Sequence, residues 1–548
     1  MSRTHRAHAG MRLLARRLHV SELPAPLVRV ERNMPIPMRD GAVLRADRWL
    51  PVDGDDAPVV LIRTPYGRGG LFGVLFGRLF AHQGFQVLLQ SCRGTAGSGG
   101  VFDRPFSCEV DDGHDTVAWL RSQSWYPGTF ATAGGSYFGY TQLALADAAP
   151  GEHVAAILAA TPLSTRDVAW PDGTFSPGVA LRWAAQAGGD PAAALRNTLS
   201  AGALDRKLRR AVAKPPLLRT YQVATRRRLP FLEEWLENED PTSLVWKEQD
   251  LSGALDAFRG AVLVQAGWYD IFLDASLRQY AQLRARDIDA RLTVGPWTHA
   301  GVGLSTVNDS IEFLREVTLG APPRAAGKRV RLTALGSTRE QLLDDWAPAE
   351  RTLTYCLTAG RLTQSAEPGA AESASRFRYD PGDPTPQLGG PLLDTRGGGG
   401  RDNRTLEGRA DVVTFDTDPL PERIVIRGGI RVQLEFGSDR PATCVFLRIC
   451  DVSPDGTSTN LVDRMVPLHD SGTSMWTVDA SLPAVAAVVG TGHRLRLQVS
   501  SGATPRFLPH PGTTEGPTRA RKRFPAQQVI YHGAGHPATV TIPISGEA

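Results

Sequence analysis

The sequence predicts an α/β protein in which a mostly parallel sheet carries a helical insertion and is followed by an antiparallel β-sandwich. Three observations support this fold class. Short apolar runs alternate with helix-period segments up to residue 160 and again after residue 254. Between these regions the sequence is rich in Ala, Leu and Arg, and after residue 350 it becomes a series of short alternating stretches. Alternating strands and helices form parallel sheets, whereas many short alternating strands form sandwiches.

The first expected element is a β-hairpin, because the turn Arg39–Gly41 joins two short alternating segments. Continuous apolar runs follow, and such runs are typical of strands that are buried on both faces of a parallel sheet. These runs are Pro58–Arg63, Phe85–Leu89, Thr129–Ala133, Val154–Ala159, Ala261–Gln265 and Ala290–Val294. Helices are expected between them, notably at Asp112–Ser122 and Tyr137–Ala148.

Residues 161–254 are predicted to form a helical cap over the sheet, with breaks at Pro177, Pro191, Pro215 and Pro230. Residues 351–548 are predicted to form the sandwich, from stretches that include Arg423–Ile426, Arg431–Phe436, Thr443–Ile449 and His493–Val499. The α/β domain is then assembled from residues 27–160 and 255–350. Residues 1–26 are basic and are expected to form a flexible extension.

Composition excludes several classes of function. The formal net charge is +4 over 548 residues, and the basic clusters at 206–210 and 226–228 are followed by acidic residues. We interpret these clusters as solvated helix faces and expect no nucleic-acid partner. The five cysteines lack the spacing of metal ligands or of a disulfide framework, so no metal or cofactor is predicted. No apolar run is long enough to span a membrane, and the N-terminus lacks the apolar core of a signal peptide. We expect a cytoplasmic protein with no membrane partner, and homo-oligomerisation stays open.

A serine flanked by glycines lies between a predicted strand and a predicted helix. In the string Gly134-Gly135-Ser136-Tyr137-Phe138-Gly139, the small residues permit a tight turn that raises the Ser136 hydroxyl above the sheet. A Gly-x-Ser-x-x-Gly string is common in proteins, so the pattern alone also describes an ordinary strand-to-helix turn. The strand, turn and helix in succession favour a nucleophile.

A serine nucleophile needs a base, and the base needs an acid that orients it. Asp270 and His299 each follow a predicted strand, in the strings Gly267-Trp268-Tyr269-Asp270 and Gly295-Pro296-Trp297-Thr298-His299. The carboxyl ends of parallel strands are the edge where α/β folds place their sites. The rival for the acid is Asp274, four residues further on, and we favour Asp270. Among the other histidines, His114 and His153 are expected in solvated polar contexts.

Stabilisation of the oxyanion requires two donors. The backbone N–H of Tyr137, which follows the nucleophile, is the expected first donor. The second should come from the loop after the first buried strand, Thr64-Pro65-Tyr66-Gly67, although Tyr66 in itself is only an aromatic residue in a turn. The aromatic residues Trp268, Trp297, Phe272 and Trp170 are candidates for an apolar substrate pocket, and each is equally suited to a core.

Four strings in order resemble the motifs of the cocaine-esterase-like hydrolases, a family grouped with the X-prolyl dipeptidyl aminopeptidases, α-amino acid ester hydrolases and glutaryl cephalosporin acylases. They are Arg63-Thr64-Pro65-Tyr66, the strings around Ser136 and Asp270, and the string that ends at His299. The resemblance implies an α/β-hydrolase domain, a helical cap and a C-terminal jelly roll. It also implies that Ser136, Asp270 and His299 form a triad, with the Tyr66 hydroxyl as the second oxyanion donor.

The expected activity is hydrolysis of a small-molecule ester or amide through an acyl-enzyme. The alternatives are an X-prolyl or aminoacyl dipeptidyl-peptidase, an acylase or an acyltransferase that uses the same triad. Peptidase activity requires carboxylates for the substrate ammonium, and no such cluster is evident in residues 161–254. A different class of protein, a carbohydrate-binding protein with an inert α/β domain, would not need Ser, Asp, His and Tyr together.

Overall fold

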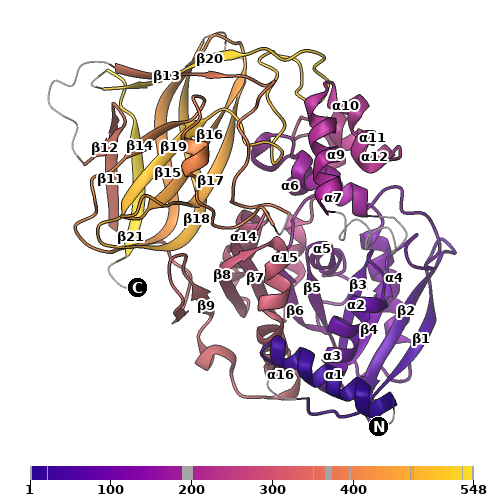
Figure 1. The fold of residues 1–548 in the computed structure, drawn as a ribbon. Coiled ribbons are helices and arrows are strands. Elements are labelled where there is room, and N and C mark those ends of the chain that lie inside the picture. The colour runs from indigo at the N-terminus through magenta and orange to yellow at the C-terminus, as the bar shows by residue number, and fades with distance from the viewer. Residues whose placement is uncertain are drawn as a thin grey trace.

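The computed structural model describes residues 3–20, 23–187, 201–349, 351–364, 373–393, 396–469, 472, 474–533 and 535–545. Two large sheets dominate it, and they follow one another along the chain (Figure 1). Residues 28–343 (indigo through magenta to rose) hold the mixed sheet and its cap, and the chain from residue 351 onward (orange to yellow) holds the β-sandwich.

The first sheet has the strand order β1-β2-β4-β3-β5-β6-β7-β8-β9-β10. Strands β3 to β9 pair in parallel, whereas β1, β2 and β10 are antiparallel to their neighbours. Each of the six expected apolar runs lies on one of these strands. The strands are β1 Val28–Pro37, β2 Val43–Pro51, β3 Val59–Thr64, β4 Gln86–Ser91, β5 Phe130–Gly135, β6 His153–Ala159, β7 Ala261–Tyr269, β8 Ala290–Thr298, β9 Val330–Thr333 and β10 Glu340–Leu343.

Helices connect the parallel strands and cover the sheet. The predicted helix after Ser136 is shorter than expected, because it ends at Leu143 and the chain continues in turns. The helices of this domain are α2 Gly70–Phe72, the π-helix η1 Gly73–Arg78, α3 Leu79–His82, α4 Glu109–Arg121, α5 Tyr137–Leu143, α14 Leu273–Arg284, α15 His299–Ser305, α16 Val307–Leu319 and the 3₁₀ turn η4 Arg324–Gly327.

The segment between β6 and β7 is helical, as predicted, and lies above the first sheet in Figure 1. Pro177 and Pro230 each begin a helix, a position where proline costs no hydrogen bond. Pro191 lies outside the described residues. The helices are α6 Arg166–Ala169, η2 Pro171–Gly173, α7 Pro177–Gln186, α9 Ala201–Ala213, α10 Leu217–Thr220, α11 Gln222–Thr225, α12 Pro230–Glu237, α13 Leu244–Lys247 and η3 Ser252–Ala257.

The second sheet belongs to the C-terminal domain, with the order β13-β20-β15-β21-β11-β12-β14-β19-β16-β17 and β18 paired to β15. The two stretches Arg423–Ile426 and Arg431–Phe436, predicted as separate strands, both contribute residues to the single strand β15. Its pairing with β18 continues on both sides of a β-bulge between Gly429 and Arg431. The elements are β11 Arg351–Thr358, β12 Arg361–Thr363, β13 Ser373–Tyr379, α17 Arg404–Glu407, β14 Val413–Asp416, β15 Ile424–Ser438, β16 Thr443–Val452, β17 Ser458–Leu468, β18 Met475–Val489, β19 Arg494–Ser500, β20 Ala526–His532 and β21 Thr539–Ser545.

The N-terminal segment was expected to be a flexible extension, and the structure corrects this. Arg3–Arg17 form helix α1, and Met11 and Ala15 are buried in the main hydrophobic core. The two residues are one helical turn apart, so they share one apolar face that the surrounding arginines conceal in the sequence. Further on, Ala25 is bound to His82 at the end of α3 by two hydrogen bonds. The Ala25 N–H donates to the His82 carbonyl at 3.0 Å, and the His82 Nδ1 lies 2.7 Å from the Ala25 carbonyl oxygen.

His153 was expected to be solvated, and this was also wrong. It begins β6, stacks on Phe130 with ring centroids 4.8 Å apart, and its Nε2 lies 2.8 Å from the Thr132 hydroxyl. Burial lowers the pKa of His153 to about 4, so the ring is neutral at pH 7.

None of the helices in the described ranges combines the length and apolar character that crossing a bilayer requires.

Candidate active site

Ser136 sits at a sharp turn between β5 and α5. Its backbone has φ 58° and ψ −124°, a strained conformation for a residue with a side chain. The turn is held by the Ser136 N–H, which lies 2.9 Å from the carbonyl of Ala159 and 3.1 Å from that of Ala160. A Cβ on Gly134 would lie 2.5 Å from Phe138, and one on Gly139 would overlap Thr161. The glycines are therefore required by the geometry that presents the serine.

His299 and Asp270 meet at the carboxyl ends of neighbouring strands. His299 follows β8 and begins α15, and Asp270 follows β7. The His299 Nδ1 lies 2.8 Å from Asp270 Oδ1, and the Asp270 side chain is completely buried. The same carboxylate oxygen accepts the backbone N–H of Phe272 at 3.2 Å. A buried carboxylate on Nδ1 fixes the tautomer whose Nε2 is free to accept a proton.

The rival acid, Asp274, lies in another environment. It is the second residue of α14 and forms an ion pair of 2.5 Å with Arg464 of strand β17. The Asp274–Arg464 pair links the first domain to the sandwich. The carboxylate that pairs with His299 is that of Asp270.

Tyr66 lies in the loop after β3 and is oriented by aromatic neighbours. Its ring stacks on Phe72 at 5.9 Å and packs against Phe138, two residues after the serine, at 5.6 Å. Its hydroxyl accepts a 3.0 Å hydrogen bond from the indole Nε1 of Trp183 in the cap helix α7. Burial raises the pKa of Tyr66 to about 12 despite this bond, so the hydroxyl stays protonated at neutral pH. Its own proton can therefore be donated elsewhere.

Tyr137 is the first residue of α5, so its N–H has no partner within the helix. Its side chain points away into a buried network beneath the turn. The Tyr137 hydroxyl donates to Glu109 Oε1 at 2.8 Å and accepts the Phe106 N–H at 2.9 Å, and Arg63 Nη2 donates to Glu109 Oε2 at 2.7 Å. Burial raises the pKa of Tyr137 well above its usual value. The network fixes the residue that carries the expected oxyanion amide.

Ser136 and His299 line one small cavity of about 20 Å³. Most of the remaining wall is apolar and comes from the cap and from the loop after Asp270. Its other lining residues are Phe106, Tyr137, Pro162, Val168, Val179, Trp183, Ile271, Phe272 and Leu393. Phe272 also presents its edge to the His299 ring at 5.3 Å.

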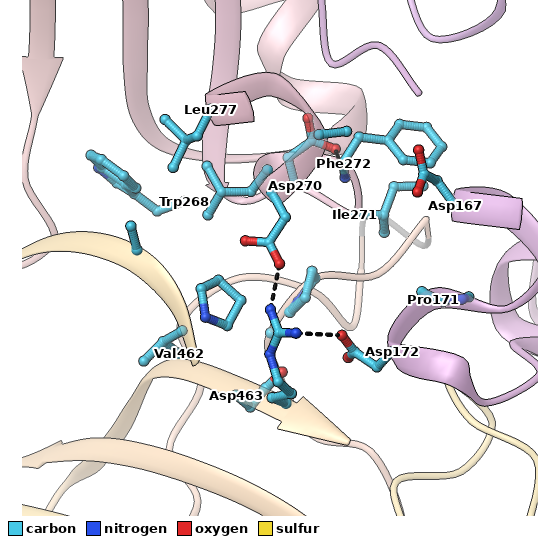
Figure 2. A pocket seen from close by; sticks show the side chains of 18 of the residues that line it. Asp167, Pro171, Asp172, Trp268, Asp270, Ile271, Phe272, Leu277, Val462 and Asp463 are labelled. Atoms are coloured by element: carbon cyan, nitrogen blue, oxygen red, sulfur yellow. Dashed lines mark hydrogen bonds and ion pairs between the residues drawn. The ribbon is translucent and has the colours of Figure 1, made fainter. Parts of the chain in front are cut away.

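A second cavity of about 590 Å³ lies beside the first, where the α/β domain, the cap and the sandwich meet (Figure 2). Asp270, Ile271 and Phe272 form part of its wall, so it reaches the back of the proposed acid. In Figure 2, Trp268, Leu277 and Val462 lie on one side, and Asp167 and Asp172 of the cap lie on the other. Its size is in the range of small-molecule sites, roughly 300–1,000 Å³.

The four aromatic candidates for substrate contact are dispersed. Phe272 lines both cavities, and Trp268 lines the larger one, where its indole donates to the Thr333 carbonyl at 2.7 Å. Trp297 packs against Ala159, Ala160 and Val302, and Trp170 is buried in the cap, where it donates to the Trp235 carbonyl at 2.8 Å. Among the described residues, neither Trp170 nor Trp297 lines either cavity.

Sequence reasoning missed Trp183 and Glu109. Trp183 lies in an Ala-rich helix and is 117 residues from Tyr66 along the chain, so no local pattern links the two. Glu109 is a charged residue at the start of helix α4, and its buried partner Arg63 lies on strand β3, 46 residues earlier in the chain. The described residues bring no group of three or more His, Cys, Asp or Glu side chains into an arrangement that could hold a metal ion.

The sheet, the strained serine turn and the His–Asp pair define an α/β serine hydrolase. Comparison with known proteins agrees. Residues 40–301 match the family model of the X-Pro dipeptidyl-peptidases (S15 family), and residues 325–541 match the C-terminal non-catalytic domain of the same peptidases. The chain is 27% identical to the cocaine esterase of Rhodococcus sp. (strain MB1 Bresler), across 94% of this chain and 98% of that protein.

Two solved structures share the fold. An α-amino acid ester hydrolase superposes with a TM-score of 0.80 at 20% identity, covering 96% of this chain and 98% of that one. An aminopeptidase from the marine sediment archaeon Thaumarchaeota archaeon superposes with a TM-score of 0.79 at 21% identity, covering 95% and 96%. This chain belongs to the family of cocaine-esterase-like hydrolases and X-Pro dipeptidyl-peptidases, and it is a hydrolytic serine enzyme.

Proposed function

We propose that the protein cleaves a carboxylic ester or amide of a small molecule through an acyl-enzyme on Ser136. The observation that carries this proposal is the 2.8 Å bond between His299 and Asp270, in a cavity that His299 lines together with Ser136. A serine hydroxyl is a weak nucleophile until a neutral imidazole removes its proton. These are the groups that the reaction needs.

In the proposed reaction, Ser136 Oγ bonds to the substrate carbonyl carbon while its proton passes to His299 Nε2. The negative charge that develops on the carbonyl oxygen is stabilised by the Tyr137 N–H and the Tyr66 hydroxyl. The bond to the leaving group then breaks, and the leaving group takes the proton from His299. Water repeats the sequence on the acyl-enzyme and releases the acid.

Labelling with a fluorophosphonate probe, followed by hydrolysis assays, tests the proposal. The wild-type protein should be labelled, whereas Ser136→Ala should not be labelled and should lose on the order of 10⁴-fold or more in kcat. Ser124→Ala, at an exposed serine before β5, is the matched control and should behave as wild type. A Ser136→Ala variant that keeps a tenth of wild-type turnover would end the proposal.

Substrate type is resolved by a panel of p-nitrophenyl esters and aminoacyl anilides. We expect esterase activity to exceed peptidase activity. Turnover confined to X-prolyl or aminoacyl anilides would instead support the peptidase alternative on the same triad. In either case activity should fall on acidification, because only the neutral imidazole can accept the serine proton.

A further inference from the structure

The cavity of about 590 Å³ is separate from the site of the proposed nucleophile. Ser136 and His299 line the small cavity, and neither of them lines the large one. The large cavity has its own access to solvent, because two of its lining residues on helix α14, Arg278 and Ala281, are exposed. A molecule that binds in the large cavity therefore does not have to pass Ser136.

The walls of this junction cavity come from all three parts of the molecule (Figure 2). The α/β domain supplies Trp268 and Leu277, the cap supplies Pro171, and the sandwich supplies Val462. Small-molecule sites are typically concave, mostly apolar in their lining and located where domains meet. The volume, the apolar side chains and the position of the junction cavity all agree with such a site.

The charged side chains of the junction cavity already have partners. Arg464 lies 2.5 Å from Asp274 and 3.5 Å from Asp172, as Figure 2 shows by its two dashed lines. An ionic ligand would have to displace a partner of this kind or bring a charge that stays unpaired, whereas an uncharged ligand leaves every pair intact. The other two arginines of the lining pair in the same way, Arg506 with Asp463 and Arg278 with Asp167.

We propose that the junction cavity is a second binding site, distinct from the place of the substrate at Ser136, and that it takes an uncharged small molecule with an aromatic or alicyclic ring system. The ring system packs on the apolar walls that Trp268, Leu277 and Val462 provide. Burial of this apolar surface supplies the binding free energy, and the ion pairs at the rim select against charged molecules.

A ligand in the junction cavity would contact the loop that carries the proposed acid. Asp270, Ile271 and Phe272 all line the cavity. Phe272 donates its N–H to Asp270 Oδ1 at 3.2 Å and presents its ring edge to His299 at 5.3 Å. The ligand would thus touch a residue that contacts both members of the His–Asp pair, while the wall between the two cavities stays closed. Binding does not depend on the proposed function, whereas an effect on turnover does.

Isothermal titration calorimetry with three probes of one ring system tests the class of ligand. At pH 7, 2-naphthol is uncharged, 2-naphthoate is an anion and 2-naphthylmethylamine is a cation. We expect saturable one-to-one binding of 2-naphthol and at least about tenfold weaker binding of either ion, because neither ion finds a free partner for its charge. Absence of 2-naphthol binding, or equally tight binding of an ion, overturns the proposal.

A pair of variants on helix α14 tests the location of the site. Ala281 is exposed and lies in the lining, so Ala281→Trp reduces the space without disturbing the core. Ala285, at the end of the same helix, is exposed and lies outside the lining, and Ala285→Trp is the matched control. Ala281→Trp should raise the Kd for 2-naphthol by at least about tenfold, and the control should keep the wild-type Kd. Equal Kd values for the two variants, with wild-type melting temperatures, overturn the proposal.

Protein labelled at Ser136 by a fluorophosphonate separates the second site from the first. The labelled protein should still bind 2-naphthol, because neither Ser136 nor His299 lines the junction cavity. Loss of binding on labelling would show that 2-naphthol occupies the substrate site, and would overturn the proposal. Absence of labelling would instead overturn the proposed function, and calorimetry of the two variants would still decide whether the second site exists.

Discussion

Tyr66→Phe is the most informative single substitution in the proposed oxyanion site. Phenylalanine preserves the ring contacts with Phe72 and Phe138 at 5.9 and 5.6 Å, so the loop after β3 keeps its packing. The hydroxyl is lost, and with it one donor to the charge that develops in the transition state. Removal of one such donor costs about 2.7–4 kcal/mol, or roughly 10² to 10³ in kcat, with a much smaller effect on KM.

The hydrogen bond from Trp183 provides an independent measure of the same role. The Trp183 indole donates to the Tyr66 oxygen, so the Tyr66 hydroxyl proton stays available for another acceptor. The same hydrogen bond polarises the hydroxyl and makes Tyr66 a stronger donor. Trp183→Phe removes a neutral hydrogen bond worth about 0.5–1.5 kcal/mol, so kcat should fall about 2- to 12-fold. Since Trp183 acts through Tyr66, the double variant should be no slower than Tyr66→Phe alone.

Pre-steady-state kinetics with an activated ester provide the assay, because acylation can then be followed as a burst. Thermal unfolding of each variant serves as the control for folding, since Tyr66→Phe leaves a buried indole N–H without its acceptor. Acylation by Tyr66→Phe within about threefold of wild type would remove Tyr66 from the oxyanion site. Strictly additive losses in the double variant would show that Trp183 acts only by packing.

Two further predictions concern the framework of the site. Burial lowers the pKa of His153 to about 4 in the folded protein, whereas the same side chain has a pKa of about 6.5 in the unfolded chain. As the pH falls from about 6.5 towards 4, His153 therefore takes up a proton in the unfolded chain but not in the folded protein. The free energy of unfolding should decrease over that pH range by up to about 3 kcal/mol. Urea unfolding at pH 7 and pH 4.5 should show a smaller loss for His153→Gln, and identical losses would contradict the assignment. Gly139→Ala places a methyl group against Thr161 and should destabilise the protein by roughly 1–3 kcal/mol. Gly151→Ala, where the added Cβ meets nothing within 4 Å, should be neutral, and equal melting temperatures for the two variants would refute the steric argument.

The parallel strands and the serine turn were predictable because their physical requirements are local. A strand buried on both faces leaves an uninterrupted apolar run, and β3 and β7 show it clearly. A turn that presents Ser136 needs small neighbours, and Gly134 and Gly139 occupy the positions where a Cβ would collide. Asp270 and His299 could be paired because each follows a predicted strand, at the edge of the sheet where α/β folds place their sites. The structure adds that these strands, β7 and β8, are neighbours.

Features that depend on distant partners could not be predicted in the same way. His153 has a polar neighbour, Glu152, and looks solvated in the sequence, yet the ring stacks on Phe130 and is buried. In the sequence, helix α1 resembles a basic arm, because the core in which Met11 is buried is formed by residues distant in the chain. Trp183 became a candidate only when the fold brought it to Tyr66, because an aromatic residue in a cap helix is equally suited to packing.

The ion pairs around Arg464 bear on how the chain can be divided for engineering. Arg464 comes from the sandwich, and its partners Asp274 and Asp172 come from the α/β domain and the cap respectively. An α/β domain expressed without the sandwich would keep both carboxylates and lose their shared cation. Exchanging the C-terminal domain between homologues would meet the same difficulty unless an arginine arrives at this position. Shortened or chimeric versions of the enzyme therefore have to be designed around this residue.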